Sequence, residues 1–381
     1  MLINLWYVAC FEEEVPPAAP LAVRMLGQDF ALWRSGEGGI ACVSSVCIHR
    51  GGALARGRVL AGRIACPYHG WEFGADGRCA RIPSLGDAAR IPARARVDAY
   101  PVQVRYGMVW VFLGDLPEAE RPPLPDCFDF AYGADGWRTI HGRFDYRANW
   151  QRVTENGLDT AHVHFVHPAF GNPDAAVVED VPVRELPWGA ASGHTFTSSE
   201  RTTKAGALGD ALRESGAAPQ GRRKPQSEIQ FHMSGLTVMI HQKITPQISQ
   251  VIFSCKTPVS DTETTTFWVQ ARNYKLEPEH DAERREGILA VYRQDAGIVE
   301  FLTPEFVPAG LADELSVASD RLPVRFRTMV RELAARGWEI DQRRLREPYE
   351  GGARVVPGPA RRSEPGWVFD PLPLRRRDAG D

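Results

Sequence analysis

The chain has 381 residues, of which 43% are hydrophobic and 24% charged, and its formal net charge is −3. This length suffices for two folded regions, and the charge argues against nucleic acid as a main partner. Neither a signal peptide nor an apolar run of membrane-spanning length is visible, so we expect no membrane association. The seven cysteines are odd in number and scattered, which favours a reducing cytoplasm.

The first third of the chain reads as a small β domain. Residues 39–115 alternate short β-like runs with glycine-rich turns such as Gly74-Ala75-Asp76-Gly77. Two loops in this region carry the short motifs Cys47-Ile48-His49 and Cys66-Pro67-Tyr68-His69. Each motif offers one thiolate and one imidazole, so the two loops together provide two sulfur and two nitrogen ligands.

Two kinds of metal site suit this ligand set. Tetrahedral zinc would bind all four side chains on one ion. A Rieske [2Fe–2S] cluster would place Cys47 and Cys66 on one iron and His49 and His69 on the other. Zinc sites usually pair cysteine with cysteine and histidine with histidine, whereas each loop here carries one of each. This order favours the cluster, and a structural zinc knuckle is the alternative.

The C-x-H…C-x-x-H pattern, and the segment Cys66–Trp71 most closely, resembles the Rieske family. We therefore expect a Rieske [2Fe–2S] domain over residues 1–120. The proline-rich stretch from Pro117 to Pro125 predicts a linker, and residues 121–350 are expected to form a second, catalytic domain.

The segment from Asn149 to His167 predicts a helix that carries metal ligands. Read as one helix, it places Glu155, Asp159 and His162 on a common face, with His167 just beyond the helix end. Two histidines and one carboxylate on one face of the metal are typical of non-heme Fe(II) oxygenases. His164 would point elsewhere, toward substrate, toward the ligands or into the core.

A second helix around residues 288–302 offers the carboxylate. Its apolar stripe includes Tyr292 and Val299, and Asp295 interrupts that stripe. A buried acid is costly unless its charge is compensated, and a divalent iron would compensate it. A buried salt bridge is the alternative explanation for Asp295, and Glu300, which lies off the stripe, is the rival ligand.

The D-x-x-H-x-x-x-x-H spacing of Asp159, His162 and His167 resembles the mononuclear iron motif of Rieske non-heme iron oxygenases. The resemblance implies that His162, His167 and Asp295 bind Fe(II). It also implies that Asp159 bridges a cluster histidine of the neighbouring subunit to an iron-ligating histidine. Glu155 and Asn156 are further catalytic candidates, which would line the path between the centres or position substrate.

Trp6-Tyr7-Val8-Ala9 looks like the opening strand of the vanillate and dicamba demethylase group of these oxygenases. The resemblance implies an enzyme that uses O2 and electrons from a reductase or ferredoxin to hydroxylate or demethylate a small aromatic or cyclic substrate. It further implies a homotrimer, in which one subunit's cluster lies close to the next subunit's iron. An electron carrier with the cluster alone is the alternative, but it would not need the second set of metal ligands.

The remaining elements complete an α+β architecture, a small antiparallel β domain followed by an antiparallel sheet flanked by helices. Strands are predicted at 236–240, 250–254 and 264–269, and a helix at 322–336 is predicted to stop at Gly337. Residues 199–227 are basic and rich in small residues, which predicts a surface loop or a mobile lid. The segment 351–381 is rich in Pro, Gly and Arg and predicts an irregular, poorly ordered tail.

Overall fold

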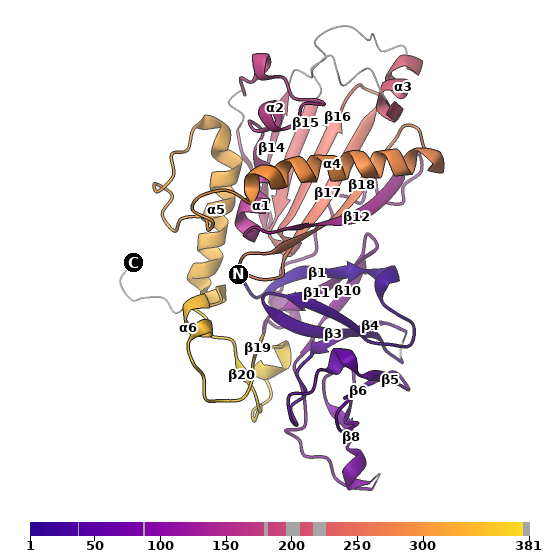
Figure 1. The fold of residues 1–381 in the computed structure, drawn as a ribbon, viewed down its shortest axis with the longest axis vertical. Helices are drawn as coiled ribbons and strands as arrows, with labels where there is room; N and C mark the ends of the chain where they lie inside the picture. The colour runs from indigo at the N-terminus through magenta and orange to yellow at the C-terminus, as the bar shows by residue number, and fades with distance from the viewer. Residues whose placement is uncertain (37, 87, 179–181, 196–205, 216–225, 376–381) are drawn as a thin grey trace. The chain divides into compact units, whose positions relative to one another are not determined.

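The computed structural model describes residues 1–381 except 37, 87, 179–181, 196–205, 216–225 and 376–381. The chain divides into two compact units (Figure 1). The first combines Met1–Pro123 with Arg331–Asp381, and the second is Leu124–Val330. Within the described residues, no helix is both long and apolar enough to cross a membrane.

The first unit consists mainly of small antiparallel sheets, ordered β1-β11-β10, β2-β3-β4-β9 and β5-β6-β7-β8. Their strands are β1 (Leu5–Phe11), β2 (Leu21–Met25), β3 (Gln28–Arg34), β4 (Ile40–Ser44), β5 (Arg58–Leu60), β6 (Arg63–Ala65), β7 (Glu72–Phe73), β8 (Cys79–Arg81), β9 (Ala99–Tyr100), β10 (Val102–Arg105) and β11 (Met108–Leu113). One apolar core joins the second and third sheets and includes Trp33, Val43 and Phe73. Cys47 and Cys66 belong to the same core, so the sulfur ends of both predicted loops are buried.

The C-terminal segment differs from the loose tail predicted by its composition. Strands β19 (Arg354–Val355) and β20 (Asp370–Pro371) pair in parallel, and the segment between them packs onto the first unit. Arg361 forms an ion pair with the buried Asp98 at 2.6 Å, and the Tyr100 hydroxyl donates to Val356 O. These buried contacts fix the segment although it has little regular structure. Residues 376–381 lie outside the described part of the chain.

The second unit contains one seven-stranded antiparallel sheet with the order β12-β18-β17-β16-β15-β14-β13. Its strands are β12 (Arg138–Tyr146), β13 (Arg184–Leu186), β14 (Gly189–Thr195), β15 (Gln226–His232), β16 (Thr237–Lys243), β17 (Ser249–Pro258) and β18 (Thr264–Arg272). The three strands predicted at residues 236–240, 250–254 and 264–269 correspond to β16, β17 and β18. Together with the helices, this sheet confirms the predicted α+β class.

The helices are α1 (Trp150–Leu158), α2 (Val163–Val166), α3 (Gly206–Glu214), α4 (Asp281–Val299), α5 (Arg321–Leu333) and α6 (Gln342–Arg346). Helix α4 crosses one face of the large sheet (Figure 1), where Ile288 packs with Ile140 and Trp268. A Cβ on Gly142 would lie 2.5 Å from the Trp268 ring, so only glycine at this position of β12 lets the indole lie flat on the sheet. After α5 the chain reverses at Gly337, whose φ of 77° matches the predicted stop.

The prediction of one continuous helix from Asn149 through His162 is wrong, because α1 ends at Leu158 and the chain leaves the helical conformation at Asp159. This residue has extended backbone angles, φ −79° and ψ 129°, and follows the end of α1. Its carboxylate accepts a hydrogen bond from the Ala161 N–H at 2.7 Å, which gives the backbone an alternative to the helix. His162 and His167 flank the short helix α2 instead of lying on the same helical face as Glu155.

The basic segment 199–227 is only partly described. Residues Gly206–Glu214 form α3, and Gln226 and Ser227 begin β15. The basic residues Arg201, Lys204, Arg222, Arg223 and Lys224 lie outside the described residues. Whether this segment is a substrate lid therefore stays a prediction.

Candidate functional site

The two Cys/His loops of the first unit have the same backbone geometry. In one loop Cys47 N donates to Gly52 O at 2.9 Å and Gly51 N donates to Cys47 O at 2.9 Å. In the other, Cys66 N donates to Trp71 O at 2.8 Å and Gly70 N donates to Cys66 O at 3.0 Å. Gly51 and Gly70 both adopt positive φ, near 71–72°, which closes each loop into a tight turn. Both loops therefore present their cysteines from equivalent positions, whereas His49 follows its cysteine by two residues and His69 by three.

These loops bring the four predicted cluster ligands together. The rings of His49 and His69 lie 4.4 Å apart, and Cys66 is close enough to Cys47 to affect its ionisation. Burial raises the pKa of Cys47 to about 12, so an isolated thiol here would stay protonated. A metal centre would supply the positive charge that a thiolate requires.

The space around the loops fits a cluster. Among the described residues, the buried Nδ1 of His49 has no hydrogen-bond partner. Burial and the neighbouring His69 lower the pKa of His49, which favours the neutral imidazole that a metal binds. A Cβ on Gly52 would lie 3.0 Å from Cys66 Sγ, so glycine leaves the sulfur side open.

The second unit brings His162, His167 and Asp295 together from two separate helices. Oδ1 of Asp295 in α4 lies 3.2 Å from Nε2 of His167 and 3.5 Å from Nε2 of His162. One ligand atom from each residue lies within 4.8 Å of the other two. Within the described residues this is a compact set of two imidazoles and one carboxylate with metal-ligand chemistry.

The set also fits a cation on electrostatic grounds. Asp295 is 6% exposed, yet its Oδ1 makes no hydrogen bond within the described part of the chain. Burial alone would raise the pKa of Asp295, but His162 and His167 lower it overall, so the carboxylate stays charged. A buried carboxylate facing two imidazole nitrogens without hydrogen bonds is the arrangement that a divalent metal compensates.

Each of the two histidines has a further partner on its other nitrogen. Nδ1 of His167 lies 2.8 Å from Oε1 of Gln294, so Nδ1 carries the proton and Nε2 is left to bind metal. Oδ2 of Asp159 lies 3.5 Å from Nδ1 of His162. Gln294 was not among the predicted site residues. The available signal was its position next to Asp295 on a helix expected to carry the ligand.

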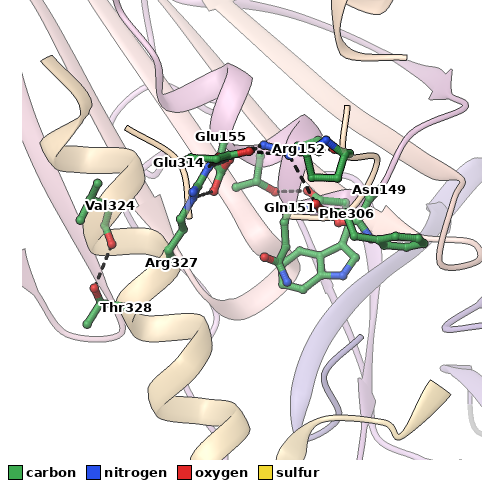
Figure 2. Close-up of polar contacts among 12 residues, drawn as sticks. Asn149, Gln151, Arg152, Glu155, Phe306, Glu314, Val324, Arg327 and Thr328 are labelled. Carbon is green, nitrogen blue, oxygen red and sulfur yellow. Dashed lines mark hydrogen bonds and ion pairs between the residues drawn. The ribbon is translucent and has the colours of Figure 1, made fainter. Parts of the chain in front are cut away.

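Glu155 occupies a different environment from the one expected of a catalytic acid. Its carboxylate forms a two-pronged ion pair with Arg327 of α5, with Arg327 Nη2 donating to Oε2 at 2.8 Å. Glu314 bridges Arg327 and Arg152, which donate to it at 2.7 and 2.8 Å (Figure 2). Glu155 holds the pKa of Arg327 above its usual value. Because its oxygens are bound by Arg327, Glu155 has the contacts of a structural ion pair.

The other predicted residues are placed as follows. Glu300, the rival to Asp295, accepts hydrogen bonds from Arg147 at 3.0–3.2 Å. His164 is buried, and its Nδ1 accepts from the Asn172 N–H at 3.3 Å, so it braces the loop after α2. Asn156 is half-buried near the end of α1.

Two known family models match this chain, and each matched region contains one of the two sets of candidate metal ligands. Residues 5–101 match the Rieske [2Fe–2S] domain, and residues 146–336 match the vanillate O-demethylase oxygenase C-terminal domain. The second match spans half of the chain. The first contains both Cys/His loops, and the second contains the His162, His167 and Asp295 set.

Several known proteins are similar over most of the chain. The iron-sulfur subunit of a toluene-4-sulfonate monooxygenase system from Comamonas testosteroni is 27% identical over 78% of this chain and 86% of its own length. The methylxanthine N1-demethylase of Pseudomonas putida is 26% identical over 87% and 89%. The structure of dicamba monooxygenase bound to 3,6-dichlorosalicylic acid superposes with a TM-score of 0.72 at 24% identity, covering 87% of this chain and 97% of that one.

The two matched domains define a protein class that couples an iron-sulfur cluster to an oxygenase centre. This chain belongs to the Rieske non-heme iron oxygenases, in the group whose catalytic domain is of the vanillate O-demethylase type. It is an oxidoreductase whose cofactors are a Rieske [2Fe–2S] cluster and a mononuclear iron. The family draws electrons from a reductase or ferredoxin and uses O2 with an organic substrate.

Proposed function

We propose that Cys47, His49, Cys66 and His69 hold the Rieske cluster, and that His162, His167 and Asp295 hold the mononuclear iron. The observation that carries the second assignment is the convergence of Asp295 Oδ1 on both Nε2 atoms, with no hydrogen bond to that buried oxygen within the described residues. Bound at these positions, the cluster supplies single electrons and the iron binds and activates O2.

The residues around the iron set orient the ligands. Gln294 accepts the Nδ1 proton of His167 and so keeps Nε2 free. The charged Asp159 lies 3.5 Å from Nδ1 of His162, where its charge favours a proton on that nitrogen without a hydrogen bond between them. Burial alone would raise the pKa of Asp159, but His162 and the Ala161 N–H lower it overall, so this carboxylate is anionic at neutral pH. We assign Asp159 the further role of linking the two metal sites across a subunit boundary in a homotrimer.

Glu155 and Asn156 receive different assignments. The ion pair with Arg327 gives Glu155 a positioning role, because it fixes α1 against α5 and thereby holds Asp159 at the end of α1. Asn156 lies three residues before Asp159 and keeps a half-buried amide. We assign this amide to the path between the metal sites or to the substrate.

The proposed reaction is oxygenation of a small aromatic or cyclic substrate by hydroxylation or oxidative demethylation, with insertion of one oxygen atom favoured. The relatives named for toluene-4-sulfonate, dicamba and methylxanthines support this range. Degradation of aromatic compounds in a reducing cytoplasm would suit a chain whose described cysteines form no disulfide.

The test begins with the purified protein. A Rieske cluster gives a red-brown colour and a characteristic EPR signal after reduction, whereas a zinc site is colourless and silent. Together with the mononuclear site, the assignment requires about three irons per chain. Product analysis with toluene-4-sulfonate, dicamba, vanillate and caffeine, with a surrogate reductase, then tests the reaction. Absence of the EPR signal in iron-replete protein would remove the cluster assignment.

A further inference from the structure

A buried lysine of the catalytic unit has no ion-pair partner within 4.0 Å among the described residues, although the charge of Asp295 acts on it from farther away. Lys256 of β17 is only 3% exposed. Its Nζ donates to Ser254 Oγ at 2.6 Å, and within the described residues no carboxylate forms an ion pair with it. An ammonium carries three donors, so two of them are left without a partner in a buried place.

The other buried cations of this unit are compensated. Arg152 and Arg327 share the carboxylates of Glu155 and Glu314 (Figure 2), and Arg272 pairs with Asp281 at 2.7 Å. Lys256 is the exception among these cations. Burial lowers the pKa of Lys256 to about 7, so at neutral pH the amine is divided between its charged and its neutral form.

Lys256 lies on the sheet face that also carries the iron set. Residues two apart on a strand share a face, so Lys256, Ser254 and Ile252 point the same way. A Cβ on Gly157, near the end of α1, would lie 3.7 Å from Nζ, and Ser254 is close enough to Tyr292 of α4 to affect the pKa of its hydroxyl. Helices α1 and α4, which lead to Asp159 and carry Asp295, therefore cover this lysine.

An apolar surface adjoins the lysine on the same face. Lys256 extends toward Ser254, and beyond Ser254 lie Ile252 and its cross-strand partner Ile240. Both isoleucines are partly exposed although β16 and β17 are central strands of the sheet. Thr266, opposite Lys256 on β18, adds a buried hydroxyl that makes no hydrogen bond with any described residue. An apolar surface beside a cation and one unsatisfied hydroxyl group is complementary to a ring that carries an acid.

We propose that Lys256, held in place by Ser254, binds an anionic group of the substrate, a carboxylate or sulfonate, while the apolar part of the substrate rests on Ile252 and Ile240. This inference rests on the proposed oxygenase function and narrows its substrates to organic acids. The substrate anion supplies the ion-pair partner that no described carboxylate provides, and Gly157 places no side chain next to Nζ. Neutral analogues leave the ammonium unpaired and bind less tightly.

The proposal is tested by binding to the resting holoenzyme, which needs no turnover. Calorimetry compares two matched pairs of probes, toluene-4-sulfonate with toluene-4-sulfonamide and 4-methylbenzoate with 4-methylbenzamide. At least one acid should bind about 10- to 100-fold more tightly than its amide. Lys256→Met should abolish this preference, and Lys243→Met, which removes an exposed lysine of β16, should keep it. Equal affinity within both pairs, no binding of either acid, or a preference retained in Lys256→Met overturns the proposal.

Proton uptake gives a second readout that a structural role for Lys256 would not produce. The titratable groups that act on Lys256 are Cys255 of its own strand and Asp295 of α4; α1, β16 and β18 face it with Gly157, Val238 and Thr266. Binding of the acid at pH 8 should therefore take up about one proton in the wild type and none in Lys256→Met. If Lys256→Met takes up as many protons on binding the acid as the wild type does, Lys256 does not bind the anion.

Measurements of stability and metal content distinguish a failure of the proposed role of Lys256 from a failure of the proposed oxygenase function. A structural lysine would lower the melting temperature when replaced, whereas removal of an uncompensated buried cation by methionine should leave it unchanged or raise it. Lys256→Met should also keep the cluster EPR signal and the full iron content. A wild type that lacks the cluster EPR signal or the mononuclear iron would refute the oxygenase assignment. A wild type that has both but shows no preference for acids would refute only the anion-binding role of Lys256.

Discussion

At the scale of single residues, the chemistry of this chain depends on which ring nitrogen each histidine offers. In the Rieske loops the cysteine ends are buried in the core, and His69 is exposed. Trp71 stacks on His49 with ring centroids 4.6 Å apart and so fixes the plane of that ring. The histidine side of the cluster site therefore faces outward, where an electron donor can approach.

Replacement of His69 by cysteine tests the cluster ligands. The [2Fe–2S] centre should persist with a potential lower by on the order of a few hundred millivolts, since thiolate places more negative charge on iron than neutral imidazole does. Redox titration followed by EPR measures the shift. Tyr68→Phe, which keeps all four ligands, is the matched control and should keep the wild-type potential. An unchanged potential in His69→Cys would show that His69 is not a ligand.

Gln294 makes a prediction about the mononuclear site. Gln294→Leu removes the acceptor of the His167 Nδ1 proton, so the ring loses its fixed tautomer and iron should bind about 10- to 100-fold more weakly. Competition with a chelator measures this affinity, and Gln294→Glu should restore it. Arg293→Gln, on the exposed neighbour in α4, is the control. Equal iron retention in Gln294→Leu would rule out an orienting role.

At the scale of elements, the sequence pattern predicted the sheet and α4 better than α1. Strands β16, β17 and β18 are rich in β-branched or aromatic residues, and the stripe that Asp295 interrupts is a buried face of α4. The break at Asp159 was missed because residues 149–167 contain no proline, and the Ala161 N–H contact that breaks the helix is a local side-chain choice. The residue types of the candidate iron site could be predicted from the sequence. Periodicity alone could not show that Asp295 lies next to His162 and His167, which precede it by 133 and 128 residues.

The ion pairs that hold α1 show the same limit. Glu155 is an acid on a helix that leads to a metal ligand, and its sequence position favoured a catalytic role. Its partner Arg327 lies 172 residues away, and such long-range pairing leaves no pattern in one sequence. The polar contacts drawn in Figure 2 therefore support the positioning role that we propose for this catalytic candidate.

Breaking this ion pair should destabilise the catalytic unit. Glu155→Gln leaves Arg327 with Glu314 as its remaining carboxylate partner among the described residues, and the lost charge-assisted hydrogen bonds should cost about 1–3 kcal/mol of the free energy of unfolding. The double variant Glu155→Met, Arg327→Met should recover part of this loss. Denaturant unfolding measures both. The control is Arg325→Met, in the same helix as Arg327. It breaks an exposed ion pair with Glu185 of β13 and should cost about 0–1 kcal/mol. A loss no larger in Glu155→Gln than in this control contradicts the positioning role.

At the scale of the whole molecule, function requires communication between two centres held by different units. The expected domain limits at residues 120 and 350 differ from the compact units, because the segment from Arg331 onward groups with the N-terminal unit. The C-terminal segment thus belongs structurally with the Rieske loops, through contacts such as Arg361 with Asp98. Only the central part of the chain forms the unit that carries the mononuclear site.

Asp159→Asn tests the proposed link between the centres. The amide keeps the size of the side chain but removes the charge beside His162. Both metal sites should stay occupied and the cluster should accept electrons normally from outside. Reoxidation of the reduced cluster by O2 and substrate should slow about 10-fold or more. Rapid mixing measures it, and wild-type rates in the variant would return Asp159 to the role of a helix-capping acid.

The central claim is that one chain carries a Rieske cluster on its Cys/His loops and a separate iron on His162, His167 and Asp295. The most direct measurement is iron content per chain together with the reduced EPR spectrum, compared between wild type and Asp295→Ala. The account predicts about three irons in the wild type and about two in the variant, with an unchanged Rieske signal in both. Equal iron content in the two proteins, or a wild type without the Rieske signal, would contradict it.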